Sequence, residues 1–156
     1  MKEYREFQPG TLGLSFLVPT HLLIVYSYLA QIGADPIVYN DFILVNGIFL
    51  LVYLLFYGMK TRVNDNRILV SFGMGLIRRT IVFKSIDSVK TVKNPWYYGW
   101  GIRFISNGIL YNVGGSAGIE LVLKESGRVV RIGTRHADQL KEEVGKRLHG
   151  LKPLSS

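Results

Sequence analysis

The sequence predicts a membrane protein of the α+β class. We expect a hairpin of two transmembrane helices, followed by a small seven-stranded β-barrel or sandwich that one C-terminal helix caps. Three observations lead to this class. The first 59 residues contain two long uncharged runs. Apolar residues then alternate with a period of two, which is typical of strands. The final segment carries an apolar stripe at helical spacing.

The composition favours a membrane protein and names no reaction. Of the 156 residues, 48% are hydrophobic and 19% are charged, and the mean hydropathy is +0.22. A typical soluble domain carries roughly 25% charged residues. There is no cysteine, which excludes a disulfide framework, a thiolate nucleophile and zinc–thiolate or iron–sulfur sites.

Two apolar runs predict the transmembrane hairpin. Residues 12–32 are 21 positions without a formal charge, roughly 31 Å of helix and the thickness of a bilayer core. Residues 42–59 are 18 more. The breaker cluster Gly33-Ala34-Asp35-Pro36 separates them. We therefore predict helices over about 12–32 and 38–59. A buried hairpin in a soluble core is the alternative.

Charge changes sign between Met59 and Lys60, where we expect the domain boundary. The net charge is −2 for residues 1–59 and +10 for residues 60–156. The predicted division is a membrane anchor over 1–59, a domain over 60–150 and a tail over 151–156. The inter-helix loop has no lysine or arginine, whereas Lys60 and Arg62 follow the second run at once. This asymmetry predicts a multi-pass protein of the cell membrane with both termini and the domain in the cytoplasm.

Two polar residues, His21 and Asn46, lie inside the predicted spans. Polar side chains in a bilayer are expensive and usually bond to another helix. We expect an intramembrane polar contact between His21 and Asn46, or with a partner helix.

The domain is predicted from alternating apolar residues bounded by glycines and Asx turns. A terminal helix follows, with its apolar stripe at Ala137, Leu140, Val144 and Leu148 and an end at Gly150. Asn107-Gly108 is a strong hairpin signal, and residues 110–113 extend the strand before a glycine loop. The seven expected strands cover residues 61–63, 68–72, 77–83, 86–89, 101–105, 119–123 and 130–132.

The segments 61–70, 75–79 and 86–89, together with Tyr98-Gly99-Trp100-Gly101 and Gly133-Thr134, resemble the bacterial pleckstrin-homology-like (PH-like) family. Members often carry one or two membrane helices before the domain. The resemblance covers about residues 60–150 and implies a PH-like roll. It implies no catalytic activity, and membrane-associated binding or scaffolding is the role expected from it.

The sequence motifs that could indicate catalysis lack the flanking elements or the partner residues that catalysis requires. Gly114-Gly115-Ser116-Ala117-Gly118 matches the G-x-S-x-G nucleophile elbow, but residues 119–123 alternate as a strand where the elbow needs a helix. We expect a hairpin loop and no nucleophile at Ser116. The three histidines are far apart and predict no metal site. We expect no enzyme and no cofactor.

The aromatic segment 95–100 has two interpretations: core packing at a strand edge, or contact with the bilayer interface. The basic residues also have two: a solvated face that only sets the topology, or contact with anionic lipid headgroups. The candidates for headgroup contact are Lys60, Arg62, Arg78 and Lys84. Arg79 shares parity with Ile77 and Ile81, which places its stem toward the core.

The function expected from these observations is a non-enzymatic, membrane-anchored module for binding or assembly at the cytoplasmic membrane surface. The alternative is an accessory subunit of a larger membrane complex. The expected partners are the lipid bilayer, including anionic lipids, and a membrane protein or a second copy of the chain. Nucleic acid is not expected, because neither a reading helix nor an exposed stacking platform is present.

Overall fold

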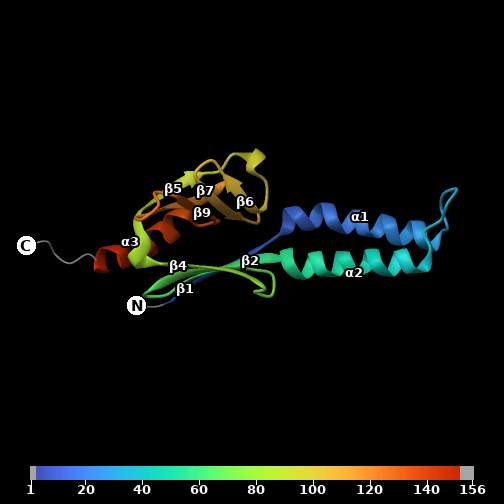
Figure 1. Cartoon of the computed structure of the whole chain (residues 1–156), viewed down its shortest axis with the longest axis horizontal. Helices are drawn as coiled ribbons and strands as arrows, with labels where there is room; N and C mark the ends of the chain where they lie inside the picture. The colour runs from blue at the N-terminus through green and yellow to red at the C-terminus, as the bar shows by residue number, and fades with distance from the viewer. Residues whose placement is uncertain (1–2, 152–156) are drawn as a thin grey trace, which may run out of the picture.

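The computed structural model describes residues 3–151, which form two apolar helices, two β-sheets and a C-terminal helix (Figure 1). Residues 152–156 of the predicted tail lie outside the described residues. In chain order the elements are β1 (Tyr4–Pro9), α1 (Thr11–Leu29), α2 (Tyr39–Phe56), β2 (Gly58–Val63), β3 (Arg67–Phe72), β4 (Ile77–Val82), the 3₁₀ turn η1 (Phe83–Ser85), β5 (Ile86–Lys93), the 3₁₀ turn η2 (Trp96–Tyr98), β6 (Gly101–Ile105), β7 (Gly108–Asn112), β8 (Ala117–Leu123), β9 (Val129–Gly133) and α3 (Ala137–Leu151).

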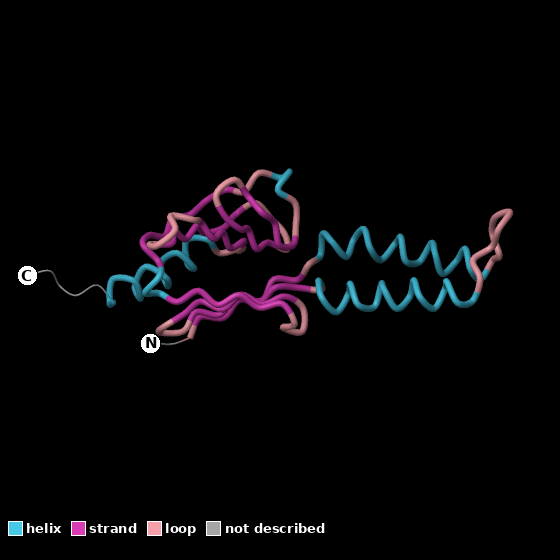
Figure 2. The backbone as a smooth tube through the Cα atoms, viewed as in Figure 1, coloured by secondary structure: helices cyan, strands magenta, loops and turns pink. Residues whose placement is uncertain are grey.

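The helical hairpin α1–α2 is inserted between two strands that pair with each other. β1 and β2 are antiparallel, from Tyr4 opposite Val63 to Pro9 opposite Gly58. The pairing continues to the helix ends, where the Gly10 N–H donates to the Tyr57 carbonyl at 2.8 Å. Figure 2 shows the two helices leaving one end of this sheet side by side. No flexible linker separates helices and sheet.

This insertion corrects the predicted division at Met59–Lys60. That boundary falls inside β2, and β1, which the prediction placed in the anchor, is a strand of the sheet. The helices end at Leu29 and Phe56, short of the predicted ends at 32 and 59. The prediction overran because Gly58 and Met59 are uncharged like the helix residues, yet they are buried in the sheet.

Within residues 3–151, nine strands form two separate sheets, where seven strands were expected. One sheet has the order β1-β2-β3-β4 and the other β5-β8-β9-β7-β6. The two additional strands are β1 and β7, the second of which was expected only as an extension of its neighbour. β7 pairs in parallel with β9, whereas the other pairings are antiparallel. The core lies between the sheets and includes Phe72, Tyr111 and Ile132.

Polar bonds fix β1 to the second sheet on one side. The Gln8 Nε2 donates to the Gly133 carbonyl at 2.8 Å. The Thr134 hydroxyl donates to Glu6 at 2.6 Å, and the Arg135 N–H donates to the same carboxylate at 3.1 Å. These bonds hold β1 against the end of β9 and the loop that follows it.

The helix α3 packs against β5, β8 and η1. Leu140 and Val144 are fully buried in the core, as the apolar stripe predicts. The buried Arg147 donates to the Glu143 carboxylate at 2.6 Å. Figure 1 shows α3 on the side of the sheets away from the helical hairpin.

Candidate functional site

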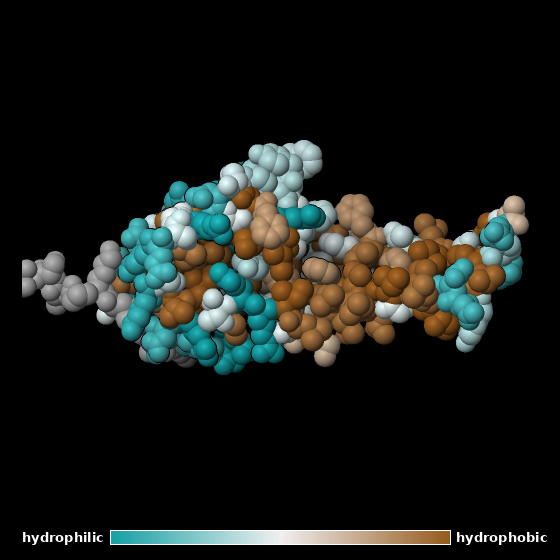
Figure 3. All heavy atoms as spheres, in the orientation of Figure 1, coloured by the Kyte–Doolittle hydropathy of each residue, from teal (hydrophilic) through white to brown (hydrophobic). Residues whose placement is uncertain are grey.

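The hairpin is apolar on all sides. α1 and α2 have 19 and 18 residues and are each long and apolar enough to cross a bilayer. Neither helix contains a residue that the rest of the chain buries. Figure 3 shows this apolar surface beside the polar surface of the sheets. The hairpin is thus not the buried core of a soluble domain within this chain.

The structure brings His21 and Asn46 together between the two helices. His21 Nε2 lies 2.9 Å from Asn46 Oδ1, and His21 Nδ1 lies 3.2 Å from the Tyr53 hydroxyl. The His21 ring stacks on Phe49 at 4.4 Å between centroids. Asn46 also donates to the Phe42 carbonyl at 2.7 Å. These polar groups are satisfied inside the hairpin.

Three of the four predicted headgroup residues lie on one face of the first sheet. Met59, Thr61 and Val63 of β2 are buried, so Lys60 and Arg62 project from the opposite, outer face. In the register, Lys60 and Arg78 both lie opposite Ser71, one on each side. The same register puts two residues that were not predicted on this face, Arg5 and Arg67. We call these five cations, Arg5, Lys60, Arg62, Arg67 and Arg78, the basic face.

The predicted headgroup residues Arg78 and Lys84 lie at opposite ends of β4. The turn between β3 and β4 lies beside the end of α2, because the Met74 N–H donates to the Leu54 carbonyl at 3.3 Å. Arg78 belongs to this end and donates to the Gly75 carbonyl. Lys84, the fourth predicted residue, follows the opposite end of β4. The structure therefore does not bring Lys84 together with Lys60 and Arg78.

Exposed apolar residues surround the base of the hairpin. Met74 and Leu76 are exposed in the β3–β4 turn. Trp100 stacks on Phe16 of α1 with 6.2 Å between centroids. Trp96 is 90% exposed, which contradicts the interpretation of the 95–100 segment as core packing. Sequence analysis did not select Met74 or Leu76 as candidate residues, because a turn carries no periodic pattern that would show which side chains are exposed.

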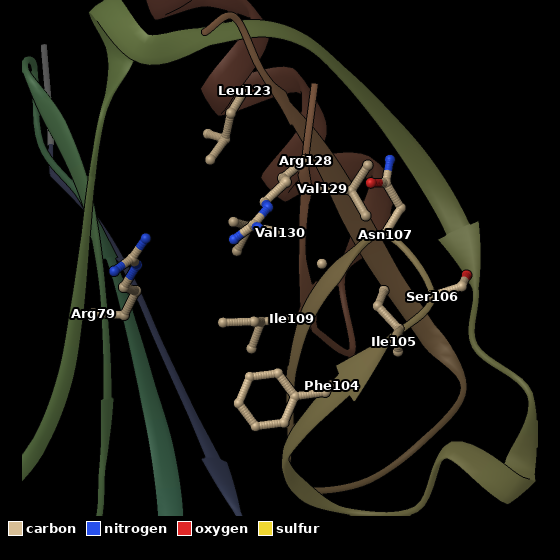
Figure 4. A pocket seen from close by; sticks show the side chains of 11 residues that line it. Arg79, Phe104, Ile105, Ser106, Asn107, Ile109, Leu123, Arg128, Val129 and Val130 are labelled. Carbon is tan, nitrogen blue, oxygen red and sulfur yellow. The ribbon is translucent and has the colours of Figure 1, made fainter. Parts of the chain in front are cut away.

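A cleft of about 410 Å³ opens between the sheets on the side opposite the Gln8 and Glu6 contacts (Figure 4). Arg79 of the edge strand β4 lines one side of the cleft, and residues from β6, β7 and β9 line the other. Its lining is about equally polar and apolar, and Arg79 and Arg128 contribute guanidinium groups. The remaining lining residues are Phe104, Ile105, Ser106, Asn107, Gly108, Ile109, Leu123, Val129 and Val130.

Glu120 of β8 is a buried carboxylate that forms two ion pairs. Glu120 accepts from Lys90 at 2.9 Å and from Arg131 at 2.7 Å. Burial alone would raise the pKa of Glu120, but the hydrogen bonds from Lys90 and Arg131 outweigh it and hold that pKa below its usual value. At the opposite edge, burial and the neighbouring Glu6 carboxylate raise the pKa of Tyr4. Both groups stabilise the sheets and face no cavity described above.

The G-x-S-x-G match leads into a strand, as expected: β8 begins at Ala117, directly after Ser116. The Ser116 carbonyl accepts from the Asn94 N–H at 2.6 Å. Within residues 3–151, no three histidine, aspartate or glutamate side chains are grouped to hold a metal ion. Comparisons with family models, curated proteins and solved structures find no match for this chain.

Proposed function

We propose that the chain is a non-enzymatic, membrane-anchored PH-like module that binds ligands or partners at the cytoplasmic surface of the cell membrane. The observation that carries the proposal is the pairing of β1 with β2 at the base of an apolar hairpin. Because one sheet contains the strands on both sides of the hairpin, both helix ends at the sheet must lie on the same side of a bilayer. An anchor of two spans meets this condition.

Charge supports the cytoplasmic side for the sheets. The basic face begins three residues after Tyr57, whereas the loop at the other end of the hairpin, residues 30–38, has no lysine or arginine. Cationic residues next to a span stay on the cytoplasmic side. The two sheets with a C-terminal helix packed on one end of the core support the PH-like proposal, which rests on the resemblance of residues 60–150.

Distance from the helices ranks the proposed headgroup contacts. At about 3.3 Å per residue, Lys60 lies roughly 10 Å beyond Tyr57 along β2, and Arg62 roughly 17 Å. The Debye length is about 8 Å at physiological salt. Lys60 and Arg78 are therefore the residues best placed to attract anionic lipid, and Lys84 is poorly placed for it.

The role of accessory subunit receives less support. Polar side chains facing lipid would favour it, because they would need a partner helix. In this hairpin His21 and Asn46 bond to each other, and the Thr20 hydroxyl donates to the Phe16 carbonyl of its own helix at 2.8 Å.

Topology is the direct test, and the chain suits it because it has no cysteine. We expect Ala34→Cys, in the inter-helix loop, to react with a membrane-impermeant maleimide on intact cells. Glu125→Cys, in the exposed β8–β9 turn, should react only after permeabilisation, and the parent chain serves as the unlabelled control. Labelling of Glu125→Cys on intact cells, or recovery of the chain in the soluble fraction, would contradict the proposal.

A further inference from the structure

The inter-sheet cleft has an apolar floor formed by one row of side chains. Val130 pairs with Ile109 and Ile109 pairs with Phe104, so all three face the same side of the second sheet. Val130 is buried in the core, whereas Phe104, on the edge strand β6, is 86% exposed. The row thus leads from the core to an open apolar shelf.

Two cations face this floor. Arg79 lies opposite the buried Val70 in the register, which places it on the inner side of β4. Arg128 comes from the turn before β9. Figure 4 shows both guanidinium groups directed into the cleft from opposite sides.

Neither guanidinium group has an acidic partner in the part of the chain that the structure describes. Within residues 3–151, no carboxylate lies within ion-pair distance of Arg79 or Arg128. By contrast, Arg131 bonds to Glu120 and Arg147 bonds to Glu143. Two like charges converging without a counter-ion create a site that an anion would stabilise.

We propose that the cleft binds an anionic amphiphile with one acyl chain in contact with the floor. Its phosphate or carboxylate group would lie between Arg79 and Arg128, and its chain along Val130, Ile109 and Phe104. The volume of about 410 Å³ is within the usual range for small-molecule pockets, roughly 300–1,000 Å³. The convergence of both cations on one position suits a single headgroup better than the charges of a peptide, which are spread along its length.

A ligand that comes from the bilayer is expected only if the proposed function is correct, since a domain tethered to a bilayer is exposed to its lipids. The shelf at Phe104 is open, so a chain can enter without a change of fold. A soluble fatty acid offers the same chemistry from the cytosol. The headgroup and acyl-chain contacts are the same for both sources.

The test uses the full chain in nanodiscs of neutral phosphatidylcholine, with bound lipid counted by native mass spectrometry. The probe is 1-palmitoyl lysophosphatidic acid. Lysophosphatidylcholine of the same chain length controls for the headgroup, and glycerol 3-phosphate controls for the acyl chain. Palmitate, and diacyl phosphatidic acid built into the disc, are two further arms that identify the cytosolic or the bilayer source.

We expect one lysophosphatidic acid per chain. Arg79→Gln with Arg128→Gln should weaken binding at least about tenfold, because each lost charge-assisted hydrogen bond is worth about that factor. Phe104→Ala should weaken it through lost apolar contact. The matched control, Lys93→Gln with Lys141→Gln, removes the same charge from exposed positions outside both the cleft and the basic face and should bind like the parent. If Arg79→Gln impairs folding, Arg128→Gln alone serves as the test variant and should also weaken the binding of lysophosphatidic acid.

Equal binding of lysophosphatidylcholine, equal binding of glycerol 3-phosphate, or an equal loss in the control variant would each overturn the proposal. Displacement of the lipid by an acidic peptide would overturn it as well and assign the cleft to a protein partner. Retention of the chain in nanodiscs reports on the anchor independently. A chain that is retained but binds no lysolipid refutes the cleft site and leaves the proposed function intact.

Discussion

Glu6 and Gln8 point inward from β1 although both are polar, and each has a partner in the second sheet. Gln8 is buried and donates to the Gly133 carbonyl. Glu6 accepts from the Thr134 hydroxyl and the Arg135 N–H. These bonds satisfy groups that would otherwise be costly to bury. Together they join the two sheets on the side opposite the cleft.

Gly108 is required for a reason that its place in the sequence does not suggest. Asn107-Gly108 predicts a hairpin turn, and β6 and β7 do form a hairpin there. A Cβ at Gly108, however, would lie 1.8 Å from the Val129 carbonyl oxygen. The glycine is therefore needed for the close parallel approach of β9, a contact between distant residues that no local pattern reveals.

The contact between His21 and Asn46 should contribute measurably to hairpin stability. We expect Asn46→Leu and His21→Leu each to destabilise the pairing of α1 with α2, with a coupling free energy of about 0.6–1.7 kcal/mol between them, the range for interhelical bonds in bilayers. A double-mutant cycle in micelles measures this coupling. Ser15→Ala is the matched control, because its hydroxyl bonds within its own helix. A coupling of zero would contradict a direct contact.

Glu120 should make stability depend on pH in the acid range. Its pKa is held below the ordinary value of 4.5, so the carboxylate stabilises the fold fully above about that pH. This stabilisation is lost as pH falls through the lower folded-state pKa. Glu120→Gln should cost about 1–3 kcal/mol at neutral pH.

The difference in unfolding free energy between Glu120→Gln and the parent should narrow below about pH 4.5. Chemical denaturation followed by tryptophan fluorescence measures it. Glu142→Gln, which removes an exposed carboxylate paired with Lys146, should change stability little at any pH. A difference that stays constant with pH would show that the Glu120 charge is not the cause.

At the level of elements, the sequence predicts those helices and strands whose apolar residues form a periodic pattern or a long uninterrupted run. The two apolar runs, the alternating strands and the stripe of α3 are found at or near their expected places. β1 was missed because its inward residues, Tyr4, Glu6 and Gln8, include two polar ones, so it lacks the apolar alternation of a strand. β7 was merged with its neighbour because its parallel partner, β9, follows 17 residues after β7 ends.

The candidate sites were predictable only in part. Lys60, Arg62 and Arg78 could be found because a charge boundary and strand parity place them outside the core. Lys84 was grouped with them by strand parity and exposure, which do not specify how far a residue lies from the helices; the structure places it after the far end of β4. The cleft could not be predicted, since it lies between residues of two sheets, and the strand order of a sheet is not encoded in any local pattern.

The pairing of β1 with β2 predicts that the domain folds without its helices. Gly10 and Tyr57 form the last bonded pair, so a two-residue Asn-Gly turn can replace residues 11–56. We expect this chain to be soluble and to unfold cooperatively. A chain that begins at residue 60 should aggregate, because it lacks β1 and leaves the edge of β2 unpaired. Equal solubility and stability of the two chains would contradict a structural role for β1.

For the whole molecule, the hydrogen-bonded junction between helices and sheet predicts that equal charge changes at different distances from the helices have unequal effects on lipid binding. In full chains held in nanodiscs with some phosphatidylglycerol, Arg78→Glu should reduce the retained anionic lipid. The loss should be worth up to about 2 kcal/mol, since a reversal removes one cation near the surface and adds an anion. Lys84→Glu makes the same change beyond the far end of β4 and should have little effect.

Two further conditions sharpen the comparison. High salt should remove the difference between the two variants, because exposed charges are screened. In the chain with the Asn-Gly turn, binding to anionic vesicles should lose its preference for Arg78, since the anchor no longer orients the sheet. Equal losses for both variants in the full chain would show that the distance from the helices does not matter.

The position of the helices between β1 and β2 also sets an order of events during synthesis. Tyr4 is made 59 residues before its partner Val63, with the whole hairpin in between. In the proposed topology β1 stays unpaired until both helices have entered the bilayer and brought the chain back to the starting side. A chain in which one helix fails to insert leaves β1 and β2 on opposite sides of the membrane, with an open sheet edge that a protease can recognise. In the proposed topology, completion of the sheet therefore requires that both helices have been inserted.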